Sequence, residues 1–229
     1  MVLGAQGKSP RDVRESLETL CRQYWPPLYA YVRHRGHSAH DAQDLTQEFF
    51  ARLLAKGWLT AAGQENGRFR SFLLMAMKRF LANEWDRSRR LKRGGGVVFI
   101  SIDATEWTGG VAPGDVAAAS VAPDALYEKR WAVTLLESVM RRLRAEHEEG
   151  GRLAEYEALK PCLTAERGGT DYQALAAVLK TEPASARSAV HRLRKRFREL
   201  FRSAVAGTVI LPGDVEDEMR AVIAALGAE

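Results

Sequence analysis

Cysteine is scarce in this chain: only Cys21 and Cys162 occur among 229 residues, far apart and without the spacing of metal ligands. This pattern excludes a disulfide-stapled secreted domain, and we expect both thiols to be free and buried in a reducing cytoplasm. No apolar run of about 18 residues exists to span a bilayer. Residues 1–12 lack the apolar segment of a secretory signal, which also favours a cytoplasmic protein.

Catalytic motifs are missing as well. The sequence has no GxSxG nucleophile motif, no GKS/T phosphate loop and no HExxH zinc motif. The five histidines have no partner at a spacing that would activate a nucleophile. We therefore expect no enzyme activity, no metal and no cofactor, and a nuclease is the weakest of the functional hypotheses.

Helical periodicity is present instead, in two blocks separated by a segment rich in Gly, Ala, Pro and Ser. The pattern predicts an all-α fold with helical domains at 9–93 and 123–205, a flexible linker at 94–122, and a tail at 206–229 with a short helix. Within the linker, Val97–Ile102 is expected to form a short strand or an extended segment. The net charge is +5, and the lysine and arginine residues are clustered on particular predicted helices.

Residues 172–202 predict a helix-turn-helix that ends in a long basic helix. The first helix would bury Leu175, Ala176, Val178 and Leu179, and the second would bury Ala186, Val190, Leu193, Phe197 and Leu200. Thr181 is the expected N-cap of the second helix, with Pro183 in its first turn. Seven cations surround the buried stripe, a pattern typical of a helix in a DNA groove. The alternative is a solvated cationic helix.

An acidic helix is predicted near residues 38–54, opened by Ser38 or His40. Asp41, Asp44 and Glu48 fall on one face of it. No other ligand cluster completes a metal shell around these carboxylates. The face is either plainly solvated or docks on a basic partner surface.

A second basic helix follows the loop at 56–69, which is polar and glycine-rich. Its apolar stripe is surrounded by nine cations, with Asn83 and Trp85 among them. Aromatic, cationic and amide groups together are able to hold unstacked single-stranded bases. Trp85 is either exposed for this purpose or packed between domains.

The tail carries Val215, Met219, Val222 and Ile223 on one side of a short helix that is rich in acidic residues. Such a helix is marginal alone in water, so it is expected to dock on another part of the chain. Two hypotheses follow: packing against the helix-turn-helix domain, or a latch that covers the cations of residues 187–202.

In this order, the segments resemble bacterial sigma factors of the extracytoplasmic-function (ECF) group. DAQDLTQEFFARLL (41–54) is similar to the family's DAEDLxQExFxRL, and GRFRSFLLMAMKRFLANEWDRSRR (67–90) to FRxWLxxIAxNxxxDxxRxxxR. YQALAAVLKTEPASARSAVHRLRKRFREL (172–200) is similar to YxEIAxxLGxxxGxVKxxxHRxRxxLRxxL. Departures include Phe72 for Trp, Arg79 for Asn, Gln173 for an acidic residue, and Lys180 for the Gly that ends the first helix of the last module.

The resemblance implies a transcription initiation factor that binds core RNA polymerase, at the β′ clamp helices and the β flap, and reads promoter DNA. The implied polymerase-binding residues are Asp41, Asp44, Gln47 and Glu48. Those implied to read and melt the −10 element are Arg68, Arg70, Lys78, Arg79, Asn83, Arg87 and Arg90. Those implied to read the −35 element are Thr181, Ala184, Arg187, Ser188, His191, Arg192, Arg194 and Lys195. An anti-sigma factor is a further expected kind of partner, and no membrane insertion is expected.

The main alternative is a conventional helix-turn-helix regulator with a ligand-sensing or dimerising N-terminal domain. Such a regulator needs neither the acidic face nor the second basic helix.

Overall fold

The computed structural model describes residues 10–55, 68–92, 122–166, 168–209 and 211–227. Within these ranges it contains eight α-helices, two short 3-10 helices and no strand, apart from one isolated bridge between Arg68 and Val209. The expected all-α class is therefore confirmed. The loop at 56–67 and the linker, including the strand expected at Val97–Ile102, lie outside the described residues.

The chain forms two compact units. The first comprises Met1–Thr134 together with Thr208–Glu229, and the second comprises Leu135–Gly207. The second unit is thus an insertion in the sequence of the first. This differs from the expected boundaries, because the start of the helix at 123 and the C-terminal tail both belong to the first unit.

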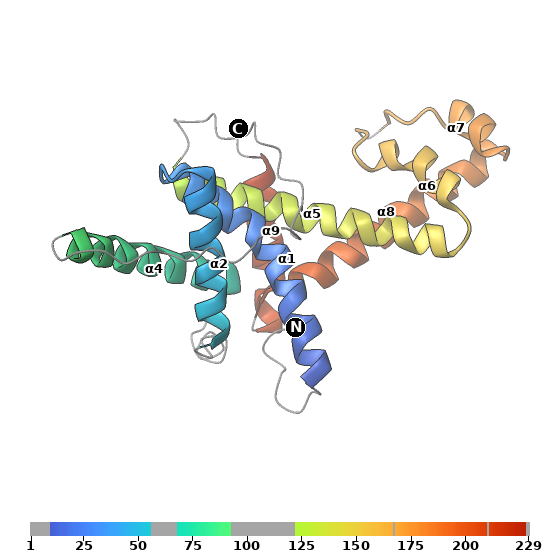
Figure 1. Ribbon diagram of the computed structural model, residues 1–229. Coiled ribbons are helices and arrows are strands. Elements are labelled where there is room, and N and C mark those ends of the chain that lie inside the picture. Colours follow the sequence, from blue (N-terminus) through green and yellow to red (C-terminus); the bar gives the residue numbers. More distant parts are fainter. Residues whose placement is uncertain (1–9, 56–67, 93–121, 167, 210, 228–229) are drawn as a thin grey trace. The chain divides into compact units, whose positions relative to one another are not determined.

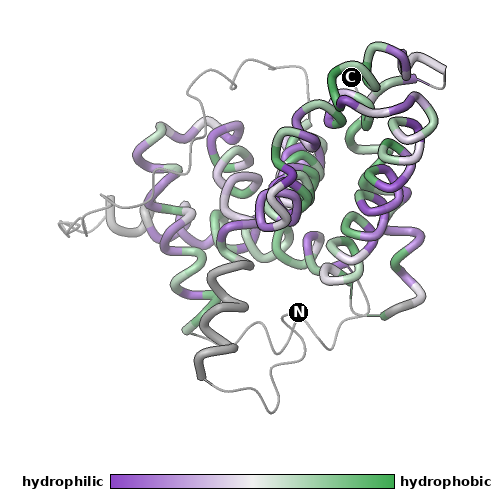
Figure 2. Tube along the Cα trace, turned by 90° about the vertical axis from the view of Figure 1, so that its right-hand side faces the viewer, coloured by the Kyte–Doolittle hydropathy of each residue, from purple (hydrophilic) through white to green (hydrophobic). Residues whose placement is uncertain are grey.

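The first unit contains α1 (Pro10–His34), α2 (Ala39–Ala55), α4 (Phe69–Lys92), the start of α5 (Pro123–Glu149), and α9 (Val215–Gly227). Figure 1 shows these elements by label, and Figure 2 shows polar and apolar residues alternating along the helices, as amphipathic packing requires. Each helix contributes at least one large buried side chain, such as Leu28, Phe49, Met77, Trp131 and Val222.

Aromatic contacts join these helices across the core of the first unit. The ring of Tyr24 meets Phe69 edge-on at 5.4 Å and stacks on Trp131 at 6.4 Å between centroids. Phe49 meets Phe80 edge-on at 5.8 Å. Offset and edge-on aromatic pairs add stability beyond burial of area. The contacts therefore hold α1, α2, α4 and the first turns of α5 together.

The second unit contains the rest of α5 with α6 (Leu153–Leu159), η1 (Lys160–Leu163), α7 (Tyr172–Leu179) and α8 (Pro183–Ala206). The stripe expected on α8 is confirmed: Ala186, Val190, Leu193 and Leu200 are buried, and Phe197 is half-buried. On α7, Leu175 and Ala176 are buried as expected. Val178 was assigned wrongly, because its side chain is 68% exposed.

The turn between α7 and α8 lies at the expected break, because α7 ends at Leu179 and α8 begins at Pro183. The Asp171 side chain caps the start of α7, accepting hydrogen bonds from the N–H groups of Gln173 and Ala174. The N-cap of α8 is Glu182 and not Thr181, whereas Pro183 does occupy the first turn. Pro183 lacks an N–H that would otherwise be unsatisfied there, so the helix begins at this residue without cost.

Lys180 takes the left-handed conformation, with φ 52° and ψ 49°, where α7 ends. Its N–H closes the helix onto the carbonyls of Ala176 and Ala177. A residue with a Cβ is strained in this region, whereas glycine is not. Lys180 therefore fulfils the backbone role for which the ECF pattern has glycine, at a cost in free energy.

Lys180→Gly is expected to stabilise the second unit by about 0.5–1 kcal/mol, because it removes the Cβ from a left-handed residue. Hydrogen exchange of peptides within 172–206, measured by mass spectrometry on the full chain, should become slower. Lys180→Ala is the matched control, since it removes the charge and keeps the Cβ. Equal exchange in the glycine and alanine variants would show that the backbone conformation at Lys180 stores no strain.

Candidate nucleic-acid interface

Helix α2 presents an acidic face that begins at Ser38. The Ser38 Oγ accepts a hydrogen bond from the N–H of Asp41 at 3.1 Å, and its hydroxyl donates to the Asp41 carboxylate at 2.6 Å. Of the two expected helix starts, Ser38 and not His40 is the cap. The hydrogen bond from Ser38 lowers the pKa of Asp41, so this carboxylate stays charged at mildly acidic pH.

The predicted polymerase-binding residues lie on this helix but differ in their surroundings. Asp41, Asp44 and Gln47 are exposed, and Asp44 is 3.2 Å from the His40 ring nitrogen Nδ1. Glu48 is half-buried and pairs with Arg52 at 2.5 Å, while Arg52 also reaches Glu84 of α4 at 2.8 Å. The exposed part of the acidic face therefore consists of Asp41, Asp44 and Gln47, and Glu48 helps to join α2 to α4.

Helix α4 carries an exposed polar stripe along its middle. Arg79, Asn83 and Arg87 are all exposed and follow one another at intervals of four, so they lie along one side of the helix. Trp85, in the same stretch, is 60% exposed within the first unit. Cations, an amide and an aromatic ring are thus available together on the surface of α4.

Lys78 and Arg90 of α4 were also predicted to contact the −10 element. Lys78 is half-buried, and its Nζ is 2.5 Å from Asp124 at the start of α5. The side chain of Arg90 lies outside the part of the chain whose side chains are described.

The assignment of Arg70 to DNA contact was wrong. Its guanidinium is 3% exposed and lies over the Trp131 ring, 4.8 Å from the centroid. The Arg70 Nε donates to Glu218 of α9 at 2.6 Å, and its Nη2 donates to the same carboxylate at 3.2 Å. Glu128 forms a further ion pair with it. The sequence pattern counted Arg70 among surface cations because its partner is distant in sequence.

Arg68 shares the carboxylate of Glu218, with its Nε at 2.8 Å, but its own side chain is 40% exposed. Glu218 is completely buried. The tail therefore contacts the first unit through Glu218. Packing against the second unit, and covering of the cations of 187–202, stay predictions. No sequence pattern singled out Glu218, since a lone acidic residue on an acidic helix resembles a solvated one.

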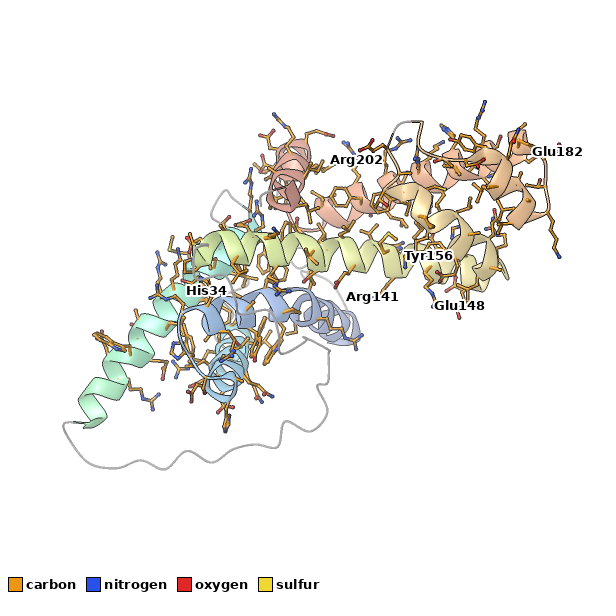
Figure 3. All side chains as sticks on the ribbon, turned by 90° about the horizontal axis from the view of Figure 1, so that it is seen from above. His34, Arg141, Glu148, Tyr156, Glu182 and Arg202 are labelled. Carbon is orange, nitrogen blue, oxygen red and sulfur yellow. The ribbon has the colours of Figure 1, made fainter. Side chains whose placement is uncertain are left out.

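Helix α8 presents most of its predicted residues to the surface, on the side away from its buried stripe. The exposed ones are Ala184, Arg187, Ser188, His191, Arg192 and Lys195, and Thr181 is exposed in the preceding turn. Figure 3 shows Glu182 at this turn, between α7 and α8. The start of a basic helix, beside an open turn, is the part that enters a major groove in helix-turn-helix proteins.

Arg187 is held in position by an aromatic neighbour. Its guanidinium lies over the ring of Tyr172, the first residue of α7, 5.0 Å from the centroid. A stacked arginine keeps its charge and its planar donors while losing conformational freedom. Sequence reasoning did not assign Tyr172 this positioning role.

Arg194 was also assigned wrongly to the DNA-binding surface. It is half-buried, and its Nε and Nη2 donate to the carbonyl of Cys162 at 3.0 and 2.6 Å, with a further bond to Ala165 at 3.3 Å. These bonds tie α8 to the end of η1. Arg194 therefore satisfies backbone carbonyls inside the unit.

Arg196, next but one along α8, donates to both carboxylate oxygens of Glu146 on α5, at 2.7 and 2.6 Å. This pairing lowers the pKa of Glu146 and raises that of Arg196. The cations of α8 thus divide into two sets, one that joins helices of the unit and one on its exposed side.

Within the described ranges, no group of three or more His, Cys, Asp or Glu side chains is arranged to hold a metal ion. None of the helices described is both long enough and apolar enough to cross a membrane. Cys162 is a buried free thiol, and Cys21 is half-buried.

Residues 20–91 match the family model for sigma-70 region 2. The match begins within α1 and covers all of α2 and nearly all of α4. The similarity to region 2 of sigma-70 factors is thus carried by residues 20–91, all of which belong to the first unit. No curated protein and no solved structure matches the chain.

The pKa of Asp41 provides a test of the cap on α2. Ser38→Ala is expected to raise this pKa toward the ordinary aspartate value, because the hydrogen bond that favours the charged form is lost. Since the folded pKa is the lowered one, the cap stabilises the helix above the unfolded pKa, and this contribution disappears as pH falls through the folded pKa.

Titration of the Asp41 carboxyl carbon by NMR measures the shift. Ser188→Ala, which removes a hydroxyl that donates to a backbone carbonyl on α8, should leave the pKa of Asp41 unchanged. An unaltered Asp41 pKa in Ser38→Ala would mean that Ser38 does not cap α2 in solution.

Proposed function

We propose that this chain is a sigma factor of the ECF group, a non-enzymatic cytoplasmic protein that directs core RNA polymerase to promoters. In this proposal, the first unit binds the polymerase and captures the opened −10 element, and the second unit reads the −35 element. The observation that carries it is the region 2 match at 20–91, followed along the chain by a helix-turn-helix with exposed cations.

Polymerase binding is assigned to the acidic face of α2. Asp41, Asp44 and Gln47 are exposed there, and the lowered pKa of Asp41 keeps that residue charged. An exposed row of carboxylates without a metal shell is suited to a basic protein surface, such as the clamp helices of the β′ subunit. Glu48 is better placed to join α2 to α4 than to reach a partner, because Arg52 occupies its carboxylate.

Capture of the −10 element is assigned to the exposed stripe of α4. Arg79 and Arg87 would meet phosphates, while Asn83 and Trp85 offer an amide and an aromatic face to unpaired bases. Stacking on an aromatic ring contributes about 1–3 kcal/mol per base, so it favours strands that are already open. This chemistry suits a factor that helps to melt DNA.

Reading of the −35 element is assigned to the exposed side of α8. Ala184, Arg187, Ser188 and His191 would lie near base edges, and Arg192 and Lys195 near phosphates. The stacking of Arg187 on Tyr172 supports a base contact, since a fixed guanidinium can donate two parallel hydrogen bonds to guanine. We expect the β flap to engage the same unit on another side.

A conventional helix-turn-helix regulator remains the second candidate, because the geometry of α7 and α8 serves either function. The two candidates differ in one requirement: only the sigma factor has to bind core polymerase. Co-purification with core RNA polymerase, in the absence of DNA, distinguishes them.

Asp44→Arg is expected to weaken core binding by about tenfold or more, because like charges brought together at an interface cost several kcal/mol. Exposed charges contribute little to folding, so the thermal unfolding temperature should stay near that of the wild type. Glu137→Arg, the same reversal at an exposed position of α5, is the matched control. If folded Asp44→Arg binds core polymerase with wild-type affinity, the acidic face of α2 is a solvated surface and not a polymerase-binding one. If the wild-type chain does not bind core polymerase at all, the sigma factor proposal is rejected.

Arg187→Ala and Lys195→Ala are expected to act differently on −35 DNA. The first should cost about 1–3 kcal/mol on the preferred sequence and relax the preference at one base pair. The second should weaken binding to all duplexes alike and reduce the salt dependence by about one phosphate contact. Binding isotherms on the preferred and scrambled duplexes, at several salt concentrations, measure both effects. The same loss for both variants on both sequences would remove the distinction between base and phosphate contacts.

A further inference from the structure

Helix α9 brings a buried negative charge to the start of α4. Glu218 has no solvent exposure, and its carboxylate contacts Arg70 at 2.6 Å and Arg68 at 2.8 Å. The chain beside it is also anchored, because the N–H of Phe69 donates to the carbonyl of Thr208 at 3.4 Å, and Arg68 and Val209 form a bridge. The contact therefore joins side chains and backbone at one place in the first unit.

The charges at this contact balance. Arg68 and Arg70 face Glu218 and Glu128, two cations and two carboxylates. The first turn of α4 has no acidic residue of its own, although negative charge is favoured at a helix N-terminus. Glu218 therefore places a carboxylate near the N-terminus of α4, where the sequence of α4 has none.

The two arginines depend on Glu218 to different degrees. Arg70 is also paired with Glu128 and lies over Trp131, so it stays surrounded by partners without Glu218. Arg68 is 40% exposed, and Glu218 is the carboxylate with which it pairs among the described residues. Loss of Glu218 would thus release the charge of Arg68 toward solvent while Arg70 remained buried.

We propose that α9 is an autoinhibitory element that withholds Arg68 from nucleic acid through Glu218. The inference rests on the proposed function, because it concerns a cation directly before the helix assigned to the −10 strand. With α9 docked, the free protein has one fewer cation available for single-stranded DNA. Displacement of α9 makes Arg68 available beside the stripe of Arg79, Asn83 and Arg87.

The experiment measures binding of the full-length free protein to an oligothymidylate of about 20 nucleotides, which has no promoter sequence. Glu218→Gln should bind it severalfold more tightly at low salt. The plot of log affinity against log salt should steepen by about 0.7, the value for one further phosphate contact on a single strand.

Two further variants make the result specific to Arg68. Arg68→Ala added to Glu218→Gln should abolish the gain in affinity and the steeper slope. Arg68→Ala alone should reduce the salt slope by much less than 0.7, because Glu218 already neutralises the charge of Arg68. Asp217→Asn is the matched control: it makes the same charge change on α9, but its ion pair with Arg220 is at the surface, where Arg220 is 78% exposed.

Unchanged or weaker binding by folded Glu218→Gln would overturn the proposal and leave α9 as a structural brace. A loss of about 0.7 in the salt slope of Arg68→Ala, the full value of one phosphate contact, would overturn it as well. This variant does not depend on the folding of Glu218→Gln. Because the probe carries no promoter and the assay no polymerase, failure here leaves core binding untouched. Failure of core binding would likewise leave the charge measurement intact.

Discussion

The first unit depends on one buried interaction, the ion pair between Arg70 and Glu218. The two residues are 148 positions apart, and neither has more than slight exposure to water. A buried charge without a partner costs several kcal/mol, so Glu218 depends on the arginines that meet its carboxylate. The pair makes α4 and α9 mutually dependent, and the backbone contacts at Thr208 and Val209 reinforce the connection.

The contact between α4 and α9 requires the chain to return to the first unit after the second unit has been formed. The polypeptide leaves the first unit within α5, forms the second unit, and returns to the first unit at Thr208. A chain with a simple tail would end after the second unit. Here the C-terminal helix is part of the core of the unit that carries the region 2 match, since Val215, Val222 and Glu218 are all buried.

The sequence predicted those features that depend on local periodicity. The buried stripe of α8 and the presence of a short helix after Pro212 follow from apolar residues three and four apart. Ser38 was one of two expected starts of α2, because serine satisfies free N–H groups. Features that depend on distant partners were not predictable in this way. Arg70 and Arg194 count as surface cations in any helical projection, yet one meets Glu218 and the other the carbonyl of Cys162. The left-handed backbone of Lys180 was likewise not predictable from the residue itself, because a side chain with a Cβ disfavours that conformation.

Under the proposed function, the chain lends promoter specificity to RNA polymerase. Run-off transcription with core polymerase, the purified chain and genomic DNA fragments measures this property. A sigma factor is expected to give discrete transcripts that require both proteins, each starting a short distance downstream of a −10 element. The contradictory result would be specific binding of the chain alone to duplex DNA, with no transcript gained when core polymerase is added.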